Sequence, residues 1–138
     1  IDGKPVQLHL WDTAGQEEYE RLRPLSYNNL HVILIAFALD VPDLLTNAAS
    51  KWVEEVHQYC PGTPYILVGL KLDLRLNSGR QYVQPELGEQ TSTRIGAKQY
   101  LESLALTGQG VDDIFEAATR IAMLTGIEKE SSGCCNVI

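Results

Sequence analysis

Two short, almost uninterrupted apolar runs constrain the fold of this 138-residue chain more than any other feature of its sequence. They span residues 31–39 and 65–70, and each has the usual length of a single strand. A strand without alternating polar residues is buried on both faces, as in a parallel sheet with helices on each side. Both runs are far shorter than the roughly 20 apolar residues of a membrane-spanning helix. We therefore expect an α/β domain.

The segments between these runs supply the remaining elements. An apolar stripe at helical spacing predicts helices over residues 43–59 and 111–125, with a weaker helix at 89–98. Further segments are expected as short strands at 6–10 and 100–104, a charged and partly helical stretch at 17–27, and a loop at 77–88. Strands that alternate with helices predict a mainly parallel sheet with flanking helices.

Charge and cysteine usage exclude several classes of function. The net charge is −7, from 11 basic and 18 acidic residues, so we expect no nucleic-acid partner. The same acidic balance weakens any case for purely electrostatic docking on a membrane. The three cysteines are odd in number, and two are adjacent near the C-terminus, which does not fit a disulfide framework. The three histidines are scattered and have no metal-ligand spacing.

Ligands of an open parallel sheet bind beyond the carboxyl ends of its strands. That rule selects residues 12–16, residues 71–73 and the loop after Leu104. In the first segment, Asp12 could hold Mg²⁺ through a water, and Gly15 could bring a backbone N–H close to a phosphate. Gln16 could orient a water for attack on that phosphate. A plain turn without a ligand is the alternative, because Asp-x-x-Gly is common by chance.

The second segment has a different chemistry. The carboxylate of Asp73 can accept two hydrogen bonds from the N1–H and N2–H edge of guanine, which adenine does not offer. The stem of Lys71 can lie along the base while its ammonium group stays in water. A solvated Lys and Asp at the end of a strand are the alternative.

Longer motifs decide between these alternatives. Residues 11–27, WDTAGQEEYERLRPLSY, closely resemble the second switch region of Rho-type small GTPases in the Ras superfamily. Residues 51–52, 60–64 and 108–120 resemble the same family, so the resemblance covers nearly the whole chain. It is closest to fungal Rho proteins of cell-wall integrity and polarity. A match of this length is specific, and it implies the small-GTPase fold and a GTP/GDP-binding switch that hydrolyses GTP.

The resemblance implies a role for each candidate residue near the phosphates. Asp12 would hold Mg²⁺ through a water, Gly15 would sense the γ-phosphate, and Gln16 would position the attacking water. In the base site, Lys71 and Asp73 would recognise guanine.

The loop after the last strand completes that base site. The backbone N–H of Ala105 would face guanine O6. Two residues depart from the family pattern, since Leu70 replaces Asn or Thr and Leu104 replaces Ser. The change at Leu70 removes about one neutral hydrogen bond, roughly 0.5–1.5 kcal/mol, and the loss of the serine hydroxyl at Leu104 is expected to loosen the loop.

The same resemblance implies a mobile partner surface within residues 17–27. Exchange factors, GTPase-activating proteins, a guanine-dissociation inhibitor and effectors such as kinases would contact it. The residues expected on this surface are Tyr19, Arg21, Leu22, Arg23 and Leu25. For the two leucines, packing of a helix is an equally good interpretation.

The last four residues form a CaaX prenylation box, with Cys135 as the lipid acceptor. One prenyl chain needs a second signal for stable anchoring, and palmitoylation of Cys134 is the better candidate because the tail is not polybasic. We therefore expect a GTPase domain at 1–126, a flexible tail at 127–138, and a location on the cytoplasmic face of the plasma membrane with a cytosolic pool.

The phosphate loop Gly-x-x-x-x-Gly-Lys-Ser/Thr and the first switch of the family do not occur in these residues. In the family they precede the region that begins here, together with a strand that would lie between residues 6–10 and 32–39. Without that strand both neighbours would expose backbone edges. We therefore expect an N-terminally truncated GTPase that folds poorly and binds nucleotide weakly by itself. A non-catalytic pseudo-GTPase that serves as a membrane-anchored binding protein is the alternative, whereas an ATPase is disfavoured because Asp73 suits guanine.

Overall fold

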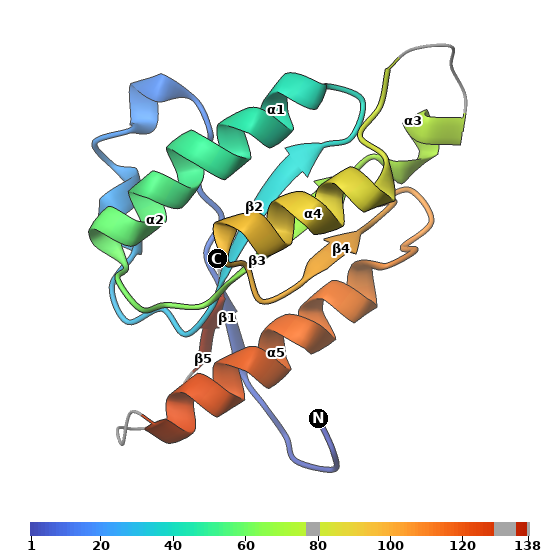
Figure 1. Ribbon diagram of the computed structural model, residues 1–138. Coiled ribbons are helices and arrows are strands. Elements are labelled where there is room, and N and C mark those ends of the chain that lie inside the picture. Colours follow the sequence, from blue (N-terminus) through green and yellow to red (C-terminus); the bar gives the residue numbers. More distant parts are fainter. Residues whose placement is uncertain (77–80, 129–134, 138) are drawn as a thin grey trace.

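The computed structural model describes residues 1–76, 81–128 and 135–137, and its centre is a three-stranded parallel sheet (Figure 1). The strand order is β2 (Ile33–Ala38), β3 (Tyr65–Leu70) and β4 (Tyr100–Glu102). β2 and β3 pair along their full length, from Ile33 opposite Tyr65 to Ala38 opposite Leu70. Both apolar runs of the sequence are therefore adjacent, paired strands of this sheet, and the expected α/β class is confirmed.

Helices cover both faces of this sheet. On one face lie α1 (Pro42–Asn47), a π-helical turn η3 (Ala48–Trp52) and α2 (Val53–Tyr59), which together form the helix expected at 43–59. α4 (Pro85–Ile95) lies on the same side, and α5 (Val111–Glu128) covers the opposite face (Figure 1). Within the described part of the chain, no helix combines the length and apolar character needed to cross a membrane.

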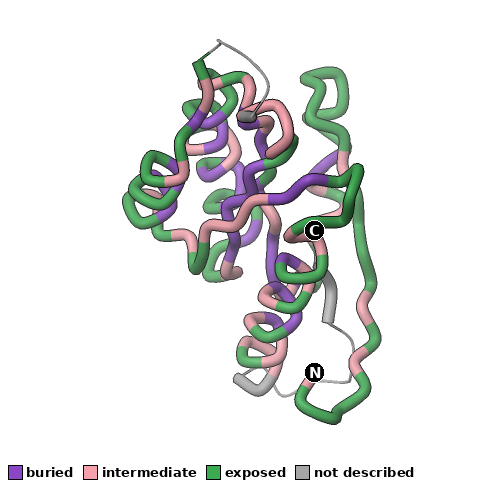
Figure 2. Tube along the Cα trace, turned by 90° about the vertical axis from the view of Figure 1, so that its right-hand side faces the viewer, coloured by how far each residue is buried: buried purple, intermediate pink, exposed green. Residues whose placement is uncertain are grey.

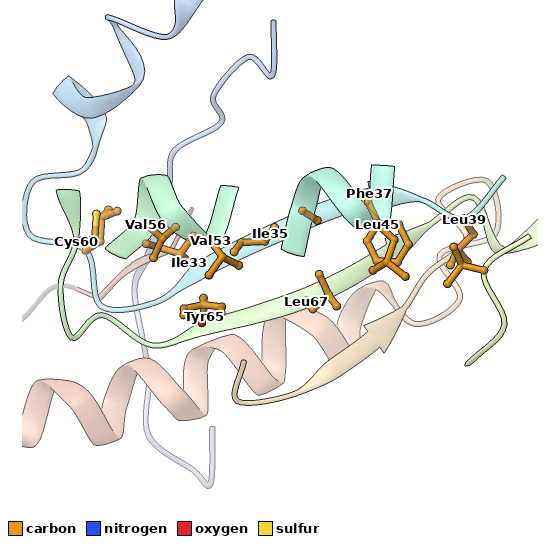
Figure 3. Packing of buried hydrophobic residues seen from close by; sticks show 13 residues of the cluster. Ile33, Ile35, Phe37, Leu39, Leu45, Val53, Val56, Cys60, Tyr65 and Leu67 are labelled. Atoms are coloured by element: carbon orange, nitrogen blue, oxygen red, sulfur yellow. The ribbon is translucent and has the colours of Figure 1, made fainter. Parts of the chain in front are cut away.

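The core is divided in two because successive side chains of a strand point to opposite faces. Figure 2 shows the buried positions running through the centre of the fold. The cluster beneath α1 and α2, drawn in Figure 3, includes Ile33, Ile35, Phe37, Tyr65, Leu67, Leu45, Val53 and Val56. The cluster beneath α5 consists of Val32, Ile66, Val68, Ile114, Ala118 and Ala122. β3 is buried on both faces over Tyr65–Gly69, whereas β2 buries one face against α1 and α2 and leaves Leu34, Ala36 and Ala38 of its other face partly or fully exposed.

The first strand is placed differently from the sequence prediction. β1 covers only Leu8–Leu10, and it pairs in parallel with β5 (Cys135–Val137) as a separate two-stranded sheet (Figure 1). Leu10 is 59% exposed, so β1 is not a buried strand of the main sheet. One edge of β1 is therefore covered by β5, whereas the outer edge of β2 has no ladder partner among the described residues.

Two helices lie where the sequence predicts a loop or the end of a strand. α3 (Leu72–Leu76) follows β3 directly, and α4 begins at Pro85 inside the segment expected to be a loop. Proline is favoured at the first position of a helix because a backbone N–H at that position has no acceptor within the helix. Proline, which lacks this N–H, therefore loses no helical hydrogen bond there. α4 ends at Gly96, whose φ of +79° gives the left-handed cap that glycine adopts without strain.

The structure also defines residues 17–27 and the C-terminal end of the domain in more detail than the sequence does. Residues 17–27 contain two 3-10 turns, η1 (Glu17–Tyr19) and η2 (Arg23–Ser26), separated by a break. α5 continues two residues beyond the expected domain end at 126. Residues 129–134, which include Cys134, and residue 138 lie outside the described residues. The division into a domain and a tail stays a prediction.

Gly88 in α4 provides a test of this packing. A Cβ at this position would overlap the ring of Tyr100, which stacks on Phe37 and whose hydroxyl donates a 2.6 Å hydrogen bond to Glu102. The ring cannot shift without losing both contacts, so Gly88→Ala is expected to cost about 1–3 kcal/mol of unfolding free energy.

Gly126 in α5 is the matched control. Its Cβ would meet nothing closer than 3.9 Å, so Gly126→Ala is expected to stabilise the helix by about 0.5–1 kcal/mol. Urea unfolding of both variants measures the difference. Equal changes in the two variants would show that Tyr100 does not pack as described.

Candidate functional site

The loop after β1 borders a cavity of about 280 Å³. Residues 11–15 line one side, residues 33–36 of β2 line another, and Trp52 and Val56 contribute from the helices. Asp12, Gly15 and Gln16 are all exposed to solvent. Asp12 and Gly15 therefore line the hollow, and Gln16 follows them in the loop without being part of its lining.

The donor set at this loop fits one class of metal site. Within the described ranges, no cluster of three or more His, Cys, Asp or Glu side chains could hold a metal ion. Asp12 supplies a single hard oxygen ligand. Mg²⁺ is commonly bound in this way, by one or two carboxylates together with waters and substrate phosphates. The residues fit a Mg²⁺ ion that arrives with a nucleotide, and they do not fit an all-protein metal centre.

A buried ionic cluster supports this loop from behind. Arg23 is only 3% exposed, and its Nε and Nη2 each donate a 3.0 Å hydrogen bond to the two carboxylate oxygens of Glu55. The hydroxyl of Tyr27 donates to the same carboxylate. The prediction that Arg23 belongs to the exposed partner surface is therefore wrong, because its guanidinium turns inward to a carboxylate of α2.

The cluster strongly favours its charged form. Burial opposes ionisation of Glu55, but hydrogen bonds from Arg23 and Tyr27 outweigh it and hold the pKa of that carboxyl below its ordinary value. The hydrogen bond to Glu55 raises the pKa of Arg23, and burial raises the pKa of Tyr27. Arg23 and Glu55 are thus a persistent ion pair at neutral pH.

Trp52 closes the cluster on its remaining side. The guanidinium of Arg23 lies 4.8 Å from the centre of the indole ring, and Lys51 Nζ lies 5.2 Å from it. Both distances are within the range of cation–π attraction. Trp52 belongs to the π-helical turn η3, a distortion that is frequent at functional sites.

The sequence interpretation missed Glu55. It follows another glutamate, and the pair appears as an ordinary solvated stretch of helix. Its spacing of three residues from Trp52 and its position beside Val56 put it on the edge of the apolar stripe. That spacing was the available signal.

A second group of predicted residues gathers beyond β3 and β4. Lys71 and Asp73 follow β3, and Ala105 follows β4. The amide of Leu72 donates a 3.1 Å hydrogen bond to the carbonyl of Ser103, and the amide of Ser103 donates at 2.9 Å to Gly69. These bonds tie the two loops together at one edge of the sheet.

Two backbone hydrogen bonds close the loop with Ala105. Leu104 N–H donates to the carbonyl of Gln109 at 2.9 Å, and Gly108 N–H donates to the carbonyl of Leu104 at 3.0 Å. Leu104 itself is buried. The loop that presents Ala105 therefore keeps its form although leucine stands at the position where the family has serine.

Lys71 adopts a conformation that is unusual for a residue with a side chain. Its φ is +63°, and its Nζ lies 3.6 Å from Oδ1 of Asp40, an atom that is buried without a hydrogen-bond partner in the described structure. Left-handed backbone at a non-glycine residue costs free energy, and such positions cluster at ligand clamps. Asp40, at the end of β2, is a second residue that sequence reasoning missed.

The structure keeps these two groups of residues apart. The cavity beside Asp12 lies along residues 33–36 of β2, whereas Lys71 pairs with Asp40 beyond the carboxyl end of the same strand. The loop after β1 and the loop after β3 therefore lie at different positions along β2.

The expected partner surface is otherwise exposed. Leu22 and Leu25 are 55% and 71% exposed, so helix packing does not account for them. Tyr19 is 44% exposed, and Arg21 is exposed as well. Their role in binding partners stays a prediction.

The pH dependence of stability tests the Arg23–Glu55 pair. The folded protein favours the Glu55 carboxylate, so the unfolded chain takes up its proton first as the pH falls below the ordinary value of 4.5. The stabilisation is complete above that pH and is lost as the pH falls toward the lower pKa of the folded state. Glu55→Gln is expected to lose roughly 3 kcal/mol at pH 7 and to flatten this acid-side slope.

Glu54→Gln removes the same charge from an exposed neighbouring residue and serves as the control. Denaturant unfolding between pH 3 and 7 compares the two variants. Identical slopes would contradict the assignment of the acid sensitivity to Glu55.

Comparison with known proteins identifies the family of this chain. A model of the Ras family matches residues 1–124. GTP-binding protein rho2 of Schizosaccharomyces pombe is 50% identical over 147 aligned residues, which cover 98% of this chain and 74% of the relative. GTP-binding protein RHO2 of Saccharomyces cerevisiae is 51% identical over 144, covering 100% and 74%, and GTP-binding protein RHO1 of Candida albicans is 49% identical over 147 with the same coverage. The chain therefore belongs to the Ras family, among its Rho-type small GTPases.

Proposed function

We propose that these residues are the base-recognition and switch portions of a protein that binds GTP and hydrolyses it to GDP and phosphate. The observation that carries the proposal is the backbone tie from Leu72 to Ser103, which holds the loops of Asp73 and Ala105 at one edge of the sheet. The similar proteins of both yeasts and of Candida albicans, all named as GTP-binding proteins, support it.

The loops after β3 and β4 would recognise guanine. The carboxylate of Asp73 would accept hydrogen bonds from guanine N1–H and N2–H, and the N–H of Ala105 would donate to O6. The stem of Lys71, held at its ammonium end by Asp40, would lie along the face of the base. Adenine offers the opposite donor and acceptor pattern at its edge, so the same groups discriminate against it.

The loop after β1 supplies the chemistry at the phosphate. Gln16 would orient a water for in-line attack on the γ-phosphate, while the N–H of Gly15 would donate to that phosphate. Mg²⁺, when bound near Asp12, neutralises negative charge on the phosphate oxygens. An arginine from an activating protein would stabilise the charge that remains in the transition state.

The exposed surface formed by Tyr19, Arg21, Leu22 and Leu25 is the proposed contact for regulators. Exchange factors, GTPase-activating proteins, a guanine-dissociation inhibitor and effector kinases would bind its apolar side chains, since exposed apolar patches commonly mark protein interfaces. With a lipid at the C-terminus, the protein would act in membrane-associated signal transduction in polarity, actin and cell-wall control. It would divide between the cytoplasmic face of the plasma membrane and a cytosolic pool.

A non-catalytic binding protein is the second candidate. Leucine at positions 70 and 104 in the base site favours it, because both residues remove a hydrogen-bonding side chain. The genomic DNA upstream of the codon for Ile1 separates the two candidates. An in-frame phosphate loop and switch threonine support the enzyme, whereas an immediate start codon supports the pseudo-GTPase.

Asp73→Asn tests recognition of the base. The change exchanges an acceptor pair for one acceptor and one donor, so each lost charge-assisted bond costs about 1.5–3 kcal/mol, or roughly tenfold to 150-fold in affinity for GTP. Titration of the polypeptide that the genomic reading frame encodes with fluorescent GTP and ATP measures the loss of affinity. Equal affinity of the unsubstituted protein for both nucleotides would refute guanine recognition.

Cys135→Ser tests the lipid anchor. Without the thiol no prenyl chain is attached, and the protein is expected to move from the membrane fraction to the cytosol. Cys134→Ser should weaken anchoring without abolishing it, since the first lipid remains. Fractionation of cells that express each tagged variant measures the distribution, and an unchanged membrane fraction in Cys135→Ser would contradict prenylation.

A further inference from the structure

The buried guanidinium of Arg23 contacts the backbone on both sides of Gly15. We propose that Arg23 is a positioning residue for hydrolysis, which fixes the direction of the Gly15 amide and the start of the Gln16 segment, and that Glu55 of α2 holds it in place. This inference rests on the proposed function for its consequence in catalysis. The contact itself is independent of any nucleotide.

The hydrogen bonds determine how the loop is aimed. Nη1 of Arg23 donates to the carbonyl of Ala14 at 3.2 Å and to the carbonyl of Gln16 at 3.0 Å. The carbonyl of Ala14 and the N–H of Gly15 belong to one planar trans peptide, so they point in opposite directions. Holding the oxygen on Arg23 therefore turns the N–H of Gly15 away from the buried cluster.

The direction of Nη1 is itself fixed. The other edge of the guanidinium carries two 3.0 Å bonds to Glu55, and the group is planar. Tyr27 donates to the same carboxylate, and the ring of Trp52 covers one face of the guanidinium. Three contacts around a planar group leave it one orientation.

A lysine at position 23 would not reproduce this arrangement. Its ammonium is a point charge with three donors, and it lacks a fork that can hold a carboxylate on one edge and two carbonyls on another. Arg23→Lys therefore keeps the charge and releases the loop. Glu55→Gln keeps Arg23 and removes the charge that fixes it.

The sequence allows a direct observation of this peptide. Ala14-Gly15 is the only Ala-Gly dipeptide in the chain, so labelling alanine with ¹³C at the carbonyl and glycine with ¹⁵N gives a single coupled amide signal. We expect this signal away from its random-coil position in the unsubstituted chain. In Arg23→Lys and in Glu55→Gln we expect it to move toward the random-coil position or to broaden.

Arg75 provides a matched control. It forms the same kind of cluster, with hydrogen bonds of 2.7 and 2.5 Å to Glu102, a further bond to the carbonyl of Val83, and Tyr100 donating to the same Glu102. Arg75→Lys disrupts an equivalent ion pair without contacting the loop after β1. It should leave the Ala14-Gly15 signal in place.

The outcomes are distinguishable. An unchanged signal in Arg23→Lys and Glu55→Gln, a random-coil signal in the unsubstituted chain, or an equal movement in Arg75→Lys would each overturn the proposal. If circular dichroism shows that Arg23→Lys is unfolded, the proposal is judged from the Ala14-Gly15 signal of Glu55→Gln.

The consequence for catalysis has its own readout. In the nucleotide-binding form, Arg23→Lys is expected to lower kcat by about 100-fold with KM unchanged, the scale of a misplacement near 1 Å. An unchanged kcat would overturn the positioning role. If the protein binds no GTP, the proposed function is refuted. The amide signal of Gly15 still tests the contact between Arg23 and this peptide in that case.

Discussion

The parallel pairing of β2 with β3 is the constraint on which the rest of the structure depends. Because β3 is buried on both faces and β2 on one, helices must cover each side, and the chain places α1, α2 and α4 on one and α5 on the other. The same pairing puts the carboxyl ends of the strands at one edge of the sheet. Asp40, Lys71 and Ser103 follow those ends, and this is how residues distant in the sequence come to share a site.

Much of this could be predicted from the sequence, for a physical reason. A strand buried on both faces has a local signature, the absence of polar alternation, and residues 31–39 and 65–70 both carry it. The motif of residues 11–27 likewise identifies its chemistry locally. The partner of β1 could not be predicted in the same way, because an edge strand of three residues pairs with whatever segment the rest of the fold brings alongside. The start of α4 was missed because few apolar residues in its first turn face the core.

The error at Arg23 has the same origin. Its neighbours in the sequence are exposed, and nothing local distinguishes it from Arg21. What buries it is a carboxylate 32 residues away, on a helix whose pattern shows a pair of ordinary glutamates. A charged residue is buried where a partner of opposite charge and suitable geometry is available, and that information is three-dimensional.

The buried Arg23–Glu55–Tyr27 cluster and the partly buried Arg75–Glu102–Tyr100 cluster are not efficient sources of stability, since well-packed apolar side chains of similar volume often do as well or better. Their geometry indicates another use. In each cluster the arginine binds a glutamate and also donates to backbone carbonyl groups. Arg23 donates to the carbonyls of Ala14 and Gln16, and Arg75 donates to the carbonyl of Val83. An apolar core cannot hold a carbonyl, and a lysine cannot hold it in one direction. Charges buried in this way therefore fix the course of a loop at the margin of the sheet, a task that hydrophobic packing cannot perform.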